Sequence, residues 1–146
     1  MRDKLTLRNN MRYFIGIASK NHIQIGQAGG FCQLCHGKAA PLKRMKQNDK
    51  IIYYSPKLTM ESKEPYQAFT ALGEIADENV YQVEMFKGFF PFRRNVLWSE
   101  IKRECPLSVA KTHLEWKAYA SKLRFGHFEV SKEFFNFLAE YMTQDS

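Results

Sequence analysis

The stretch Arg12-Tyr-Phe-Ile-Gly-Ile-Ala18 is the strongest indication of how this chain folds. It is β-prone and apolar on both faces of an extended chain, which is typical of a central strand. Working outward, alternating apolar residues bounded by turn residues predict further strands at 51–54, 67–75, 80–86, 92–98 and 124–130. We expect Asp77-Glu78-Asn79 to join two of these strands as a hairpin. Gly73 is expected to mark a bulge or a close backbone approach.

Helices are predicted between and after these strands. Ser19 is expected to cap a helix over residues 20–27 that ends at Gly29-Gly30, and Pro41 favours a single helical turn. Residues 106–123 are expected to be helical, with a ragged apolar face. Ser131 is expected to cap a final helix whose apolar residues fall at helical spacing, namely Phe134, Phe137, Leu138, Tyr141 and Met142. The pattern predicts an α+β domain around an antiparallel or mixed sheet that can curl into a small barrel.

Length and composition indicate one folded domain. The chain has 146 residues, of which 45% are hydrophobic and 14% aromatic, so it can bury a core. Residues 1–10 lack periodicity and are expected to form a loose arm, with a single domain over 11–146. The sequence contains no membrane-length apolar run and no secretory signal pattern, which favours a soluble, cytoplasmic protein. The oligomeric state is not fixed by the sequence, and a monomer is the expectation.

The distribution of charge favours a polyanionic partner. The 22 Lys and Arg residues outnumber 15 Asp and Glu, giving a net charge of +7. Basic residues dominate between Lys38 and Lys57, whereas acidic residues dominate between Glu61 and Glu84. The bland interpretation is that both stretches are solvated faces that favour solubility. Nucleic acid is the first partner that such an imbalance suggests.

Cys32-Gln33-Leu34-Cys35-His36 is the sharpest local pattern. It matches the attachment sequence for c-type haem, but haem attachment takes place in an exported context that this sequence does not indicate. A zinc site would need a fourth ligand, which Cys105 and the scattered histidines do not clearly supply. A redox site would be expected within a βαβ pattern, which is missing. Packed thiols in a turn are the favoured interpretation, with no haem, metal or other cofactor expected.

Catalytic and phosphate-binding motifs are missing from the sequence. It contains no Gly-x-Ser-x-Gly elbow, no Gly-x-x-x-x-Gly-Lys-Ser/Thr loop and no Gly-x-Gly-x-x-Gly loop. By contrast, aromatic and cationic residues recur side by side in Tyr53–Lys57 and Phe89–Arg94, and His36-Gly37-Lys38 suits a phosphate oxygen. These aromatics can equally be core residues. Their recurrence in a basic chain favours nucleic-acid binding over catalysis.

Several ordered blocks of sequence form one pattern: Tyr13–Lys20, Gly29–Lys38, Pro41–Met45, Asp49, Tyr53–Pro56 and Gln67–Ala71, extending through Phe92-Arg93-Arg94 to Phe128–Ser131. Together these blocks resemble the EVE domain family. One departure is the turn Gln47-Asn48-Asp49, where the family more usually has a Pro-Gly-Asp type of turn. The resemblance implies a PUA-like pseudo-barrel of about five to six mostly antiparallel strands flanked by short helices. Related PUA-like modules, including YTH domains, bind RNA or DNA, and several hold an unusual base in a pocket.

The resemblance also implies where a pocket lies: at Ser19, under the segment 31–38, and where residues 54–56 leave the barrel. The expected base-pocket residues are Ser19, Phe31, Gln33, Tyr54, Ser55, Phe69 and Phe125. The expected phosphate or backbone contacts are His36, Lys38, Lys57, Arg93, Arg94 and Arg124. The resulting hypothesis is a non-catalytic reader of a modified base in DNA or RNA. A small-molecule sensor that binds a free nucleoside and an enzyme that acts on a modified base or RNA remain alternatives.

Overall fold

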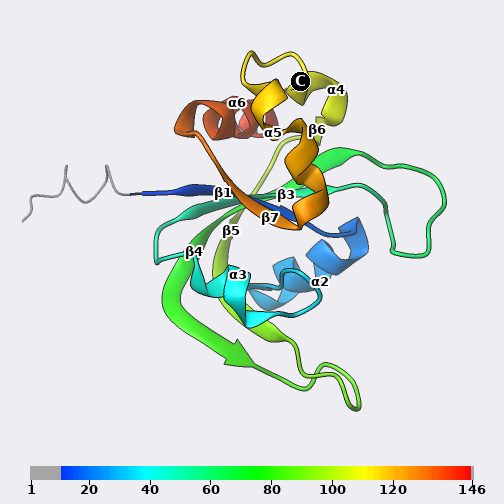
Figure 1. Cartoon of the computed structure of the whole chain (residues 1–146), viewed down its shortest axis with the longest axis vertical. Helices are drawn as coiled ribbons and strands as arrows, with labels where there is room; N and C mark the ends of the chain where they lie inside the picture. Colours follow the sequence, from blue (N-terminus) through cyan, green and yellow to red (C-terminus); the bar gives the residue numbers. More distant parts are fainter. Residues whose placement is uncertain (1–10, 146) are drawn as a thin grey trace, which may run out of the picture.

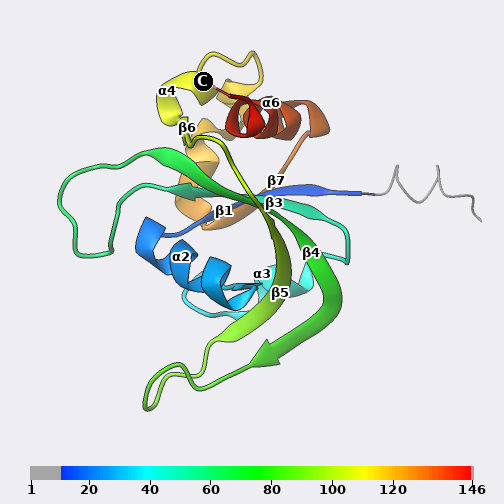
Figure 2. The ribbon, with the colours of Figure 1, turned by 180° about the vertical axis from the view of Figure 1, so that it is seen from behind.

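The computed structural model describes residues 11–145, which form a curved seven-stranded sheet with short helices around it (Figures 1 and 2). The expected arm at residues 1–10 lies outside the described residues. The strands are β1 (Tyr13–Ile17), β2 (Phe31–Cys32), β3 (Lys50–Ser55), β4 (Ala68–Gln82), β5 (Phe92–Ser99), β6 (Cys105–Pro106) and β7 (His127–Val130). The helices are α2 (Lys20–Gly29), α3 (Ala39–Lys43), α4 (Leu107–Ala110), α5 (Trp116–Tyr119), the 3-10 helix η1 (Ala120–Phe125) and α6 (Lys132–Thr143).

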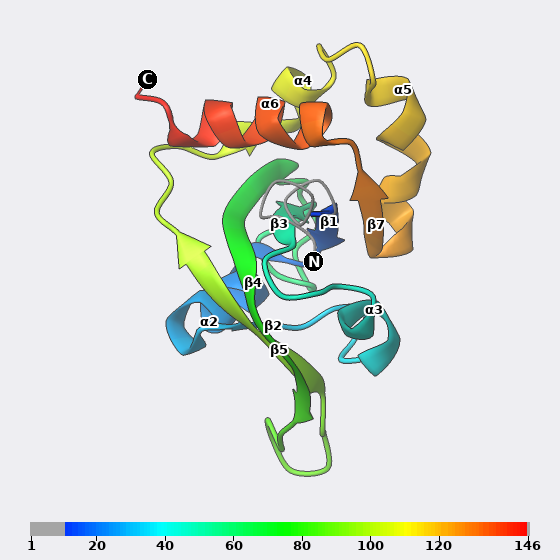
Figure 3. The same ribbon diagram turned by 90° about the vertical axis from the view of Figure 1, so that its left-hand side faces the viewer.

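The predicted α+β class and the central position of β1 are confirmed. The sheet order is β2-β5-β4-β3-β1-β7, with β6 paired to β4. β1 lies between β3, which runs parallel to it, and β7, which runs antiparallel, so the sheet is mixed. β4 is long and strongly bent (Figure 3). The sheet therefore curls, but its strand order runs from β2 to β7 and does not close into a barrel within residues 11–145.

The hairpin expected at residues 77–79 is wrong, because β4 continues through this segment to Gln82. Residues 76–79 lie opposite the single residue Asn95, between the pairs Ile75↔Val96 and Val80↔Arg94. They form an irregularity within the strand. The chain turns later, between β4 and β5, in a hairpin that projects from the body of the protein (Figures 1 and 3). We call residues 83–91 the projecting hairpin.

Helices cover both faces of the sheet and enclose two cores. α6 covers one face, as predicted, and the Ser131 hydroxyl accepts a hydrogen bond from the backbone N–H of Phe134 at 3.0 Å. α2 and α3 lie on the opposite side (Figure 3). Ile15 and Ile52 face the α6 core, while Phe14 and Ile51 face the other. The two-faced apolar character of β1 therefore reflects burial on both sides.

The helical predictions need two corrections. α2 begins after Ser19, but the Ser19 hydroxyl donates to the Asn21 side chain at 2.8 Å and does not cap the helix. The expected helical region at 106–123 consists of the separate short helices α4, α5 and η1.

The strands β2 and β6 were not predicted, because each has two residues, too few for alternation to be recognised. Gly73 does mark a close approach, since a Cβ there would lie 2.6 Å from Val96.

None of the helices in the described part of the chain is long and apolar enough to cross a membrane.

His127 in β7 is a buried titratable group with a predictable effect on stability. Its ring stacks on Phe14 with centroids 4.8 Å apart, and neither ring nitrogen has a hydrogen-bond partner within the described residues. Burial, with smaller contributions from Arg44 and Arg12, lowers the pKa of His127 from 6.5 to about 4. The unfolded chain therefore binds a proton between these two pKa values that the folded chain does not bind, and the folded state loses stability as the pH falls.

We expect His127 to lower the free energy of unfolding by about 2 kcal/mol between about pH 7.5 and about pH 5. His127→Phe keeps an aromatic ring against Phe14 and removes the titration, so its stability should depend less on pH by this amount. Urea unfolding of both proteins at several pH values measures the difference. Identical pH slopes would show that His127 does not titrate differently in the two states.

Candidate functional site

The structure contains a cavity of about 660 Å³ at the end of the sheet where β1 and β3 lead into loops. Ala18 and Ser19 line it after β1, His22 lines it from the first turn of α2, and Pro56 and Lys57 line it after β3. The loop at residues 33–37 crosses beside them, and the segment before β7 contributes Gly126. Its volume lies within the range of about 300–1,000 Å³ that is common for small-ligand sites.

The loop at residues 33–37 adopts an uncommon backbone conformation. Cys35, His36 and Gly37 have φ values of 49°, 62° and 83°, in the left-handed region that disfavours residues with a Cβ. The backbone N–H groups of Gly37 and Lys38 donate to the carbonyl of Leu34 at 3.0 and 3.1 Å. The N–H of Phe92 donates to the carbonyl of Gly37 at 2.9 Å. These bonds fix the loop to the start of β5 and hold His36 at the cavity.

The projecting hairpin supplies an aromatic wall. Phe86 and Phe89 stack with ring centroids 4.9 Å apart and an interplanar angle of 25°, and both line the cavity. Their backbones are tied, because Phe89 N–H donates to the Phe86 carbonyl at 2.8 Å, with Gly88 at a φ of 85° in the turn. Phe86 is 63% exposed, and Met60 in the loop after β3 is 68% exposed. The cavity is therefore bordered by apolar side chains that are open to solvent.

A chain of three polar side chains adjoins this wall. Arg93 Nε donates to Gln33 Oε1 at 2.7 Å, and Gln33 Nε2 lies 3.1 Å from His22 Nε2. The Arg93 guanidinium also lies over the Phe31 ring, 3.8 Å from its centroid. Burial is the main cause that lowers the pKa of His22, followed by the charges of Arg93 and His36. Gln33 and His22 line the cavity, whereas Phe31 is buried behind them.

The charged side chains at the cavity are cationic. Lys57 and Arg124 line it and are exposed, as is His36, and no carboxylate is among the described lining residues. Lys38 is exposed at the start of α3 but lies outside the lining. Phe125 is 56% exposed and also lies outside the lining, with the Arg124 guanidinium 5.3 Å from its ring centroid. An anionic ligand therefore meets favourable charge at this opening.

Three residues expected in the base pocket belong to the protein interior. Tyr54 and Phe69 pack against each other in the α6 core with centroids 5.0 Å apart, and they are 4% and 0% exposed. Ser55 is 0% exposed, and its hydroxyl is hydrogen-bonded to Thr70 at 2.8 Å. The side chains of Tyr54, Ser55 and Phe69 therefore lie in the interior and do not line the cavity.

Arg94, expected as a phosphate contact, is 1% exposed, and backbone carbonyls accept its hydrogen bonds. Its Nη1 donates to the carbonyls of Leu42 and Met45 at 2.7 and 2.6 Å. Its Nε and Nη2 donate to the carbonyl of Asp77 at 3.1 and 2.6 Å. Arg94 thus ties α3 to the irregular part of β4. Arg93, also expected as a phosphate contact, donates to Gln33 and packs on the Phe31 ring.

His22 and most of the apolar lining were not predicted from the sequence. His22 sits on a short polar helix with no pattern to distinguish it. A turn between Phe86 and Phe89 could have been expected from Gly88, because glycine marks turns between periodic segments. The expected position of the pocket, by contrast, coincides with the cavity, and Ser19, Gln33, His36, Lys57 and Arg124 all line it.

The Cys32-x-x-Cys35-His36 pattern does not assemble a metal site. Among residues 11–145, no group of three or more His, Cys, Asp or Glu side chains is arranged to hold a metal ion. Cys32 is buried, and this burial raises the pKa of its thiol to about 12. Cys35 is half-buried and lines the cavity. The arrangement agrees with packed thiols in a turn.

Sequence comparisons match nearly the whole described chain. The profile of the EVE domain family matches residues 12–141. A "UPF0310 protein" of Helicobacter hepaticus is 98% identical over 136 residues, which cover 93% of this chain and 100% of the relative.

Structural comparisons find the same fold in two complexes with nucleic acid. Human THYN1, in a crystal structure with 5-methylcytosine-containing DNA, has a TM-score of 0.56 at 14% identity, covering 93% of this chain and 100% of THYN1. The YTH domain of Zygosaccharomyces rouxii MRB1, in complex with N6-methyladenosine RNA, has a TM-score of 0.62 at 13% identity, covering 94% and 90% of the two chains. At these identities the comparison establishes a shared fold.

Proposed function

Because this chain belongs to the EVE domain family, we propose that it is a non-catalytic reader that holds one modified nucleobase of DNA or RNA in the cavity beside α2. The observation that carries the proposal is the combination of a stacked aromatic wall with a cationic, carboxylate-free opening. The two structural neighbours named above were solved with modified DNA and modified RNA. Those ligands support a modified base as the occupant.

The aromatic wall accounts for affinity in this proposal. A base extruded from its strand loses stacking on its neighbours and regains it on Phe86 or Phe89. Stacking on one aromatic side chain contributes about 1–3 kcal/mol for any base, since every base has a π-face. The cations Lys57 and Arg124 then attract the flanking phosphates. Both contributions are insensitive to the identity of the base.

Discrimination has to come from the remaining lining. Burial of a base methyl group contributes only about 0.8 kcal/mol, which corresponds to about a fourfold preference. Met60 and Met85 offer adaptable apolar surface to such a group. Polar contacts discriminate more strongly, because a mismatched base leaves buried donors or acceptors unpaired. Ser19 and His22 line the cavity, and we assign such contacts to them.

Titration against a panel of labelled oligonucleotides tests the proposal. The panel pairs single-stranded and duplex DNA and RNA carrying one 5-methylcytosine or N6-methyladenine with unmodified sequences, at one fixed salt concentration. We expect at least one modified oligonucleotide to bind more tightly than its unmodified partner. Competition with free nucleosides separates a reader from a small-molecule sensor, which would bind the nucleoside as tightly as the oligonucleotide. Equal binding of modified and unmodified strands would contradict the proposal.

The cations at the opening carry a separate prediction. Replacing Lys57 and Arg124 together by Ala should weaken binding to every sequence and reduce the salt slope of log K by about 1 for each cation removed. The matched control replaces Lys111 and Lys132, exposed residues in or beside α4 and α6, and should leave the slope unchanged. Binding measured at four or more salt concentrations gives both slopes. An unchanged slope in the Lys57 and Arg124 variant would remove these residues from the interface.

A further inference from the structure

We infer that Arg93 and Gln33 hold His22 as the neutral tautomer with its proton on Nδ1, so that His22 presents a hydrogen-bond donor to an acceptor on the edge of the bound base. The second half of this statement rests on the proposed function. The first half concerns the free protein and can be tested without any ligand.

Arg93 fixes the orientation of the Gln33 side-chain amide. A guanidinium group has only donors, so the Gln33 atom that lies 2.7 Å from Arg93 Nε must be the amide oxygen. Arg93 is itself held by packing over the Phe31 ring at 3.8 Å. The Gln33 backbone is fixed as well, because its carbonyl accepts a hydrogen bond from the Tyr53 hydroxyl at 2.6 Å. Arg93 therefore directs the Gln33 NH₂ group toward His22.

Gln33 in turn fixes the tautomer of His22. An amide NH₂ group donates and does not accept, and Gln33 Nε2 lies 3.1 Å from His22 Nε2. His22 Nε2 must therefore be the unprotonated acceptor, which leaves the proton of a neutral ring on Nδ1. A doubly protonated ring would place an N–H against the NH₂ group of Gln33. It could be accommodated only by breaking the Arg93–Gln33 hydrogen bond or the Gln33–His22 hydrogen bond.

The surroundings of His22 also favour the neutral ring. The nearby charged groups are Arg93 on β5 and His36 in the loop at 33–37, and both lower the pKa of His22, as burial does. Two further titratable groups, Cys32 and Tyr53, line a small cavity that His22 shares. Burial raises the pKa of Cys32 to about 12 and raises that of Tyr53, so neither supplies a negative charge near neutral pH.

The protonated Nδ1 of His22 can donate a hydrogen bond to a ligand in the cavity. His22 lines the main cavity, and its Nδ1 has no hydrogen-bond partner within the described residues. Its N–H is therefore available to a ring nitrogen or carbonyl oxygen on a base. A base that places an amino group there would set a donor against a donor and lose affinity. Arg93 and Gln33 are positioning residues in this arrangement, since they act through His22.

The tautomer can be observed directly by long-range ¹⁵N–¹H NMR of the free protein at neutral pH. We expect a protonated Nδ1 and an unprotonated Nε2 in the parent protein. Gln33→Glu replaces the NH₂ donor by a carboxylate, so the His22 proton should move to Nε2 and the pKa of His22 should rise. Gln24→Glu adds the same charge to an exposed position of α2 and should leave the tautomer unchanged. A parent protein with its proton on Nε2 would overturn the inference.

Binding as a function of pH tests the donor role, with 5-methylcytosine DNA and N6-methyladenosine RNA oligonucleotides as probes. Gln33→Glu should bind about tenfold more weakly than the parent at about pH 8, because its Nδ1 has become an acceptor. Acidification to about pH 6 protonates both nitrogens and should restore the affinity, while the parent changes little. All proteins carry His36→Asn, which removes the neighbouring imidazole and tolerates the left-handed backbone.

The outcomes separate the two proposals. A loss of affinity in Gln33→Glu that is the same at every pH would indicate a structural role for Gln33 and overturn the donor role of His22. If neither probe binds any of the proteins, the donor role falls together with the proposed function. The NMR result then still decides whether Arg93 and Gln33 set the tautomer.

Discussion

Replacing Arg94 by Met is expected to lower the free energy of unfolding by about 3–5 kcal/mol. The methionine has a similar length but no donors, so the carbonyls of Leu42, Met45 and Asp77 lose the guanidinium that satisfies them. A buried acceptor left without a donor is unfavourable by about 1–3 kcal/mol. The ion pair to Glu78 adds little, because the Glu78 side chain is 62% exposed.

Urea unfolding of the variant and the parent at neutral pH measures this loss. Lys43→Met in α3 is the matched control, since Lys43 is exposed and its replacement should change stability by no more than about 0.5 kcal/mol. Arg94→Lys keeps the charge but has three donors at one point, and it should give an intermediate loss. Equal stabilities of Arg94→Met and Lys43→Met would show that the guanidinium network does not stabilise the fold.

The second large effect is expected at the aromatic wall. Replacing Phe86 and Phe89 together by Ala should weaken the binding of the preferred oligonucleotide by about 5- to 150-fold, the equivalent of about 1–3 kcal/mol of stacking. Stability should change little, since the projecting hairpin contributes no residue to the two cores within the described chain. Fluorescence anisotropy titration and thermal unfolding of the same preparations measure the two quantities.

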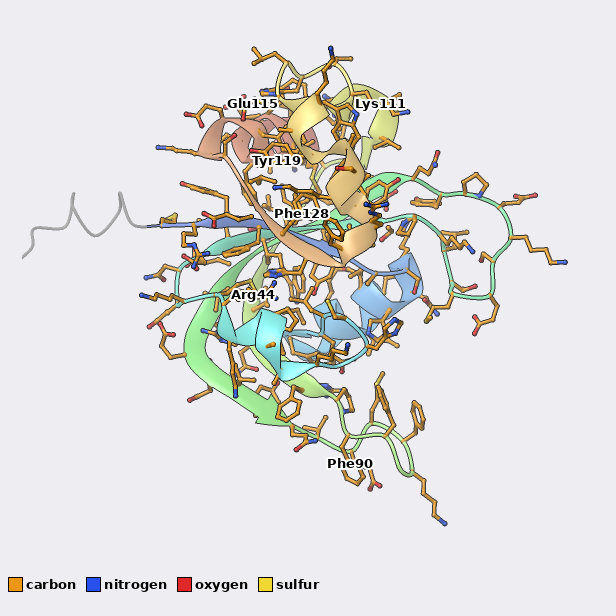
Figure 4. All side chains as sticks on the ribbon, viewed as in Figure 1. Arg44, Phe90, Lys111, Glu115, Tyr119 and Phe128 are labelled. Atoms are coloured by element: carbon orange, nitrogen blue, oxygen red, sulfur yellow. The ribbon has the colours of Figure 1, made fainter. Side chains whose placement is uncertain are left out.

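Phe90 provides the matched control on the same hairpin. It is 51% exposed, does not line the cavity, and lies at the outer side of the hairpin (Figure 4). Phe90→Ala should therefore bind like the parent, and Phe86→Tyr should retain most of the affinity because it keeps a stacking surface. A loss for Phe90→Ala as large as that for the double variant would mean that general apolar exposure, rather than stacking in the cavity, accounts for binding.

The parts of the fold that were predicted correctly have patterns that extend over many residues. β1 is apolar on both faces because it is covered on both sides, and α6 has a long apolar stripe behind a Ser131 cap. The hairpin expected at Asp77–Asn79 failed because turn-forming residues also suit an irregularity within a strand. There, the Asp77 side chain accepts hydrogen bonds from Asn79 N–H and from Asn95. Local composition cannot distinguish the two cases.

The cavity lies where the resemblance implied a pocket, and only some of the expected residues line it. The loops were recognised through blocks of sequence that resemble the EVE domain family, whereas the direction of each side chain depends on the register of the sheet. Arg94 illustrates the point, because a cation beside aromatic residues is equally compatible with a binding surface and with a buried network. Arg94 lies two residues before Val96 in the same strand, so the two side chains point to the same face of the sheet. Val96 is 4% exposed, and its apolar character was the sign in the sequence that Arg94 also points inward.

The segments that line the cavity are largely separate from the cores that stabilise the fold, and this affects how the sequence can diverge. The hairpin at 83–91 and the loop at 56–67 supply side chains to the cavity, yet neither contributes to the cores that hold the sheet and helices together within residues 11–145. Substitutions in these two segments should therefore destabilise the protein less than substitutions in the cores. Under the proposed function, such changes would alter which chemical group the cavity binds while the sheet and helices are inherited unchanged.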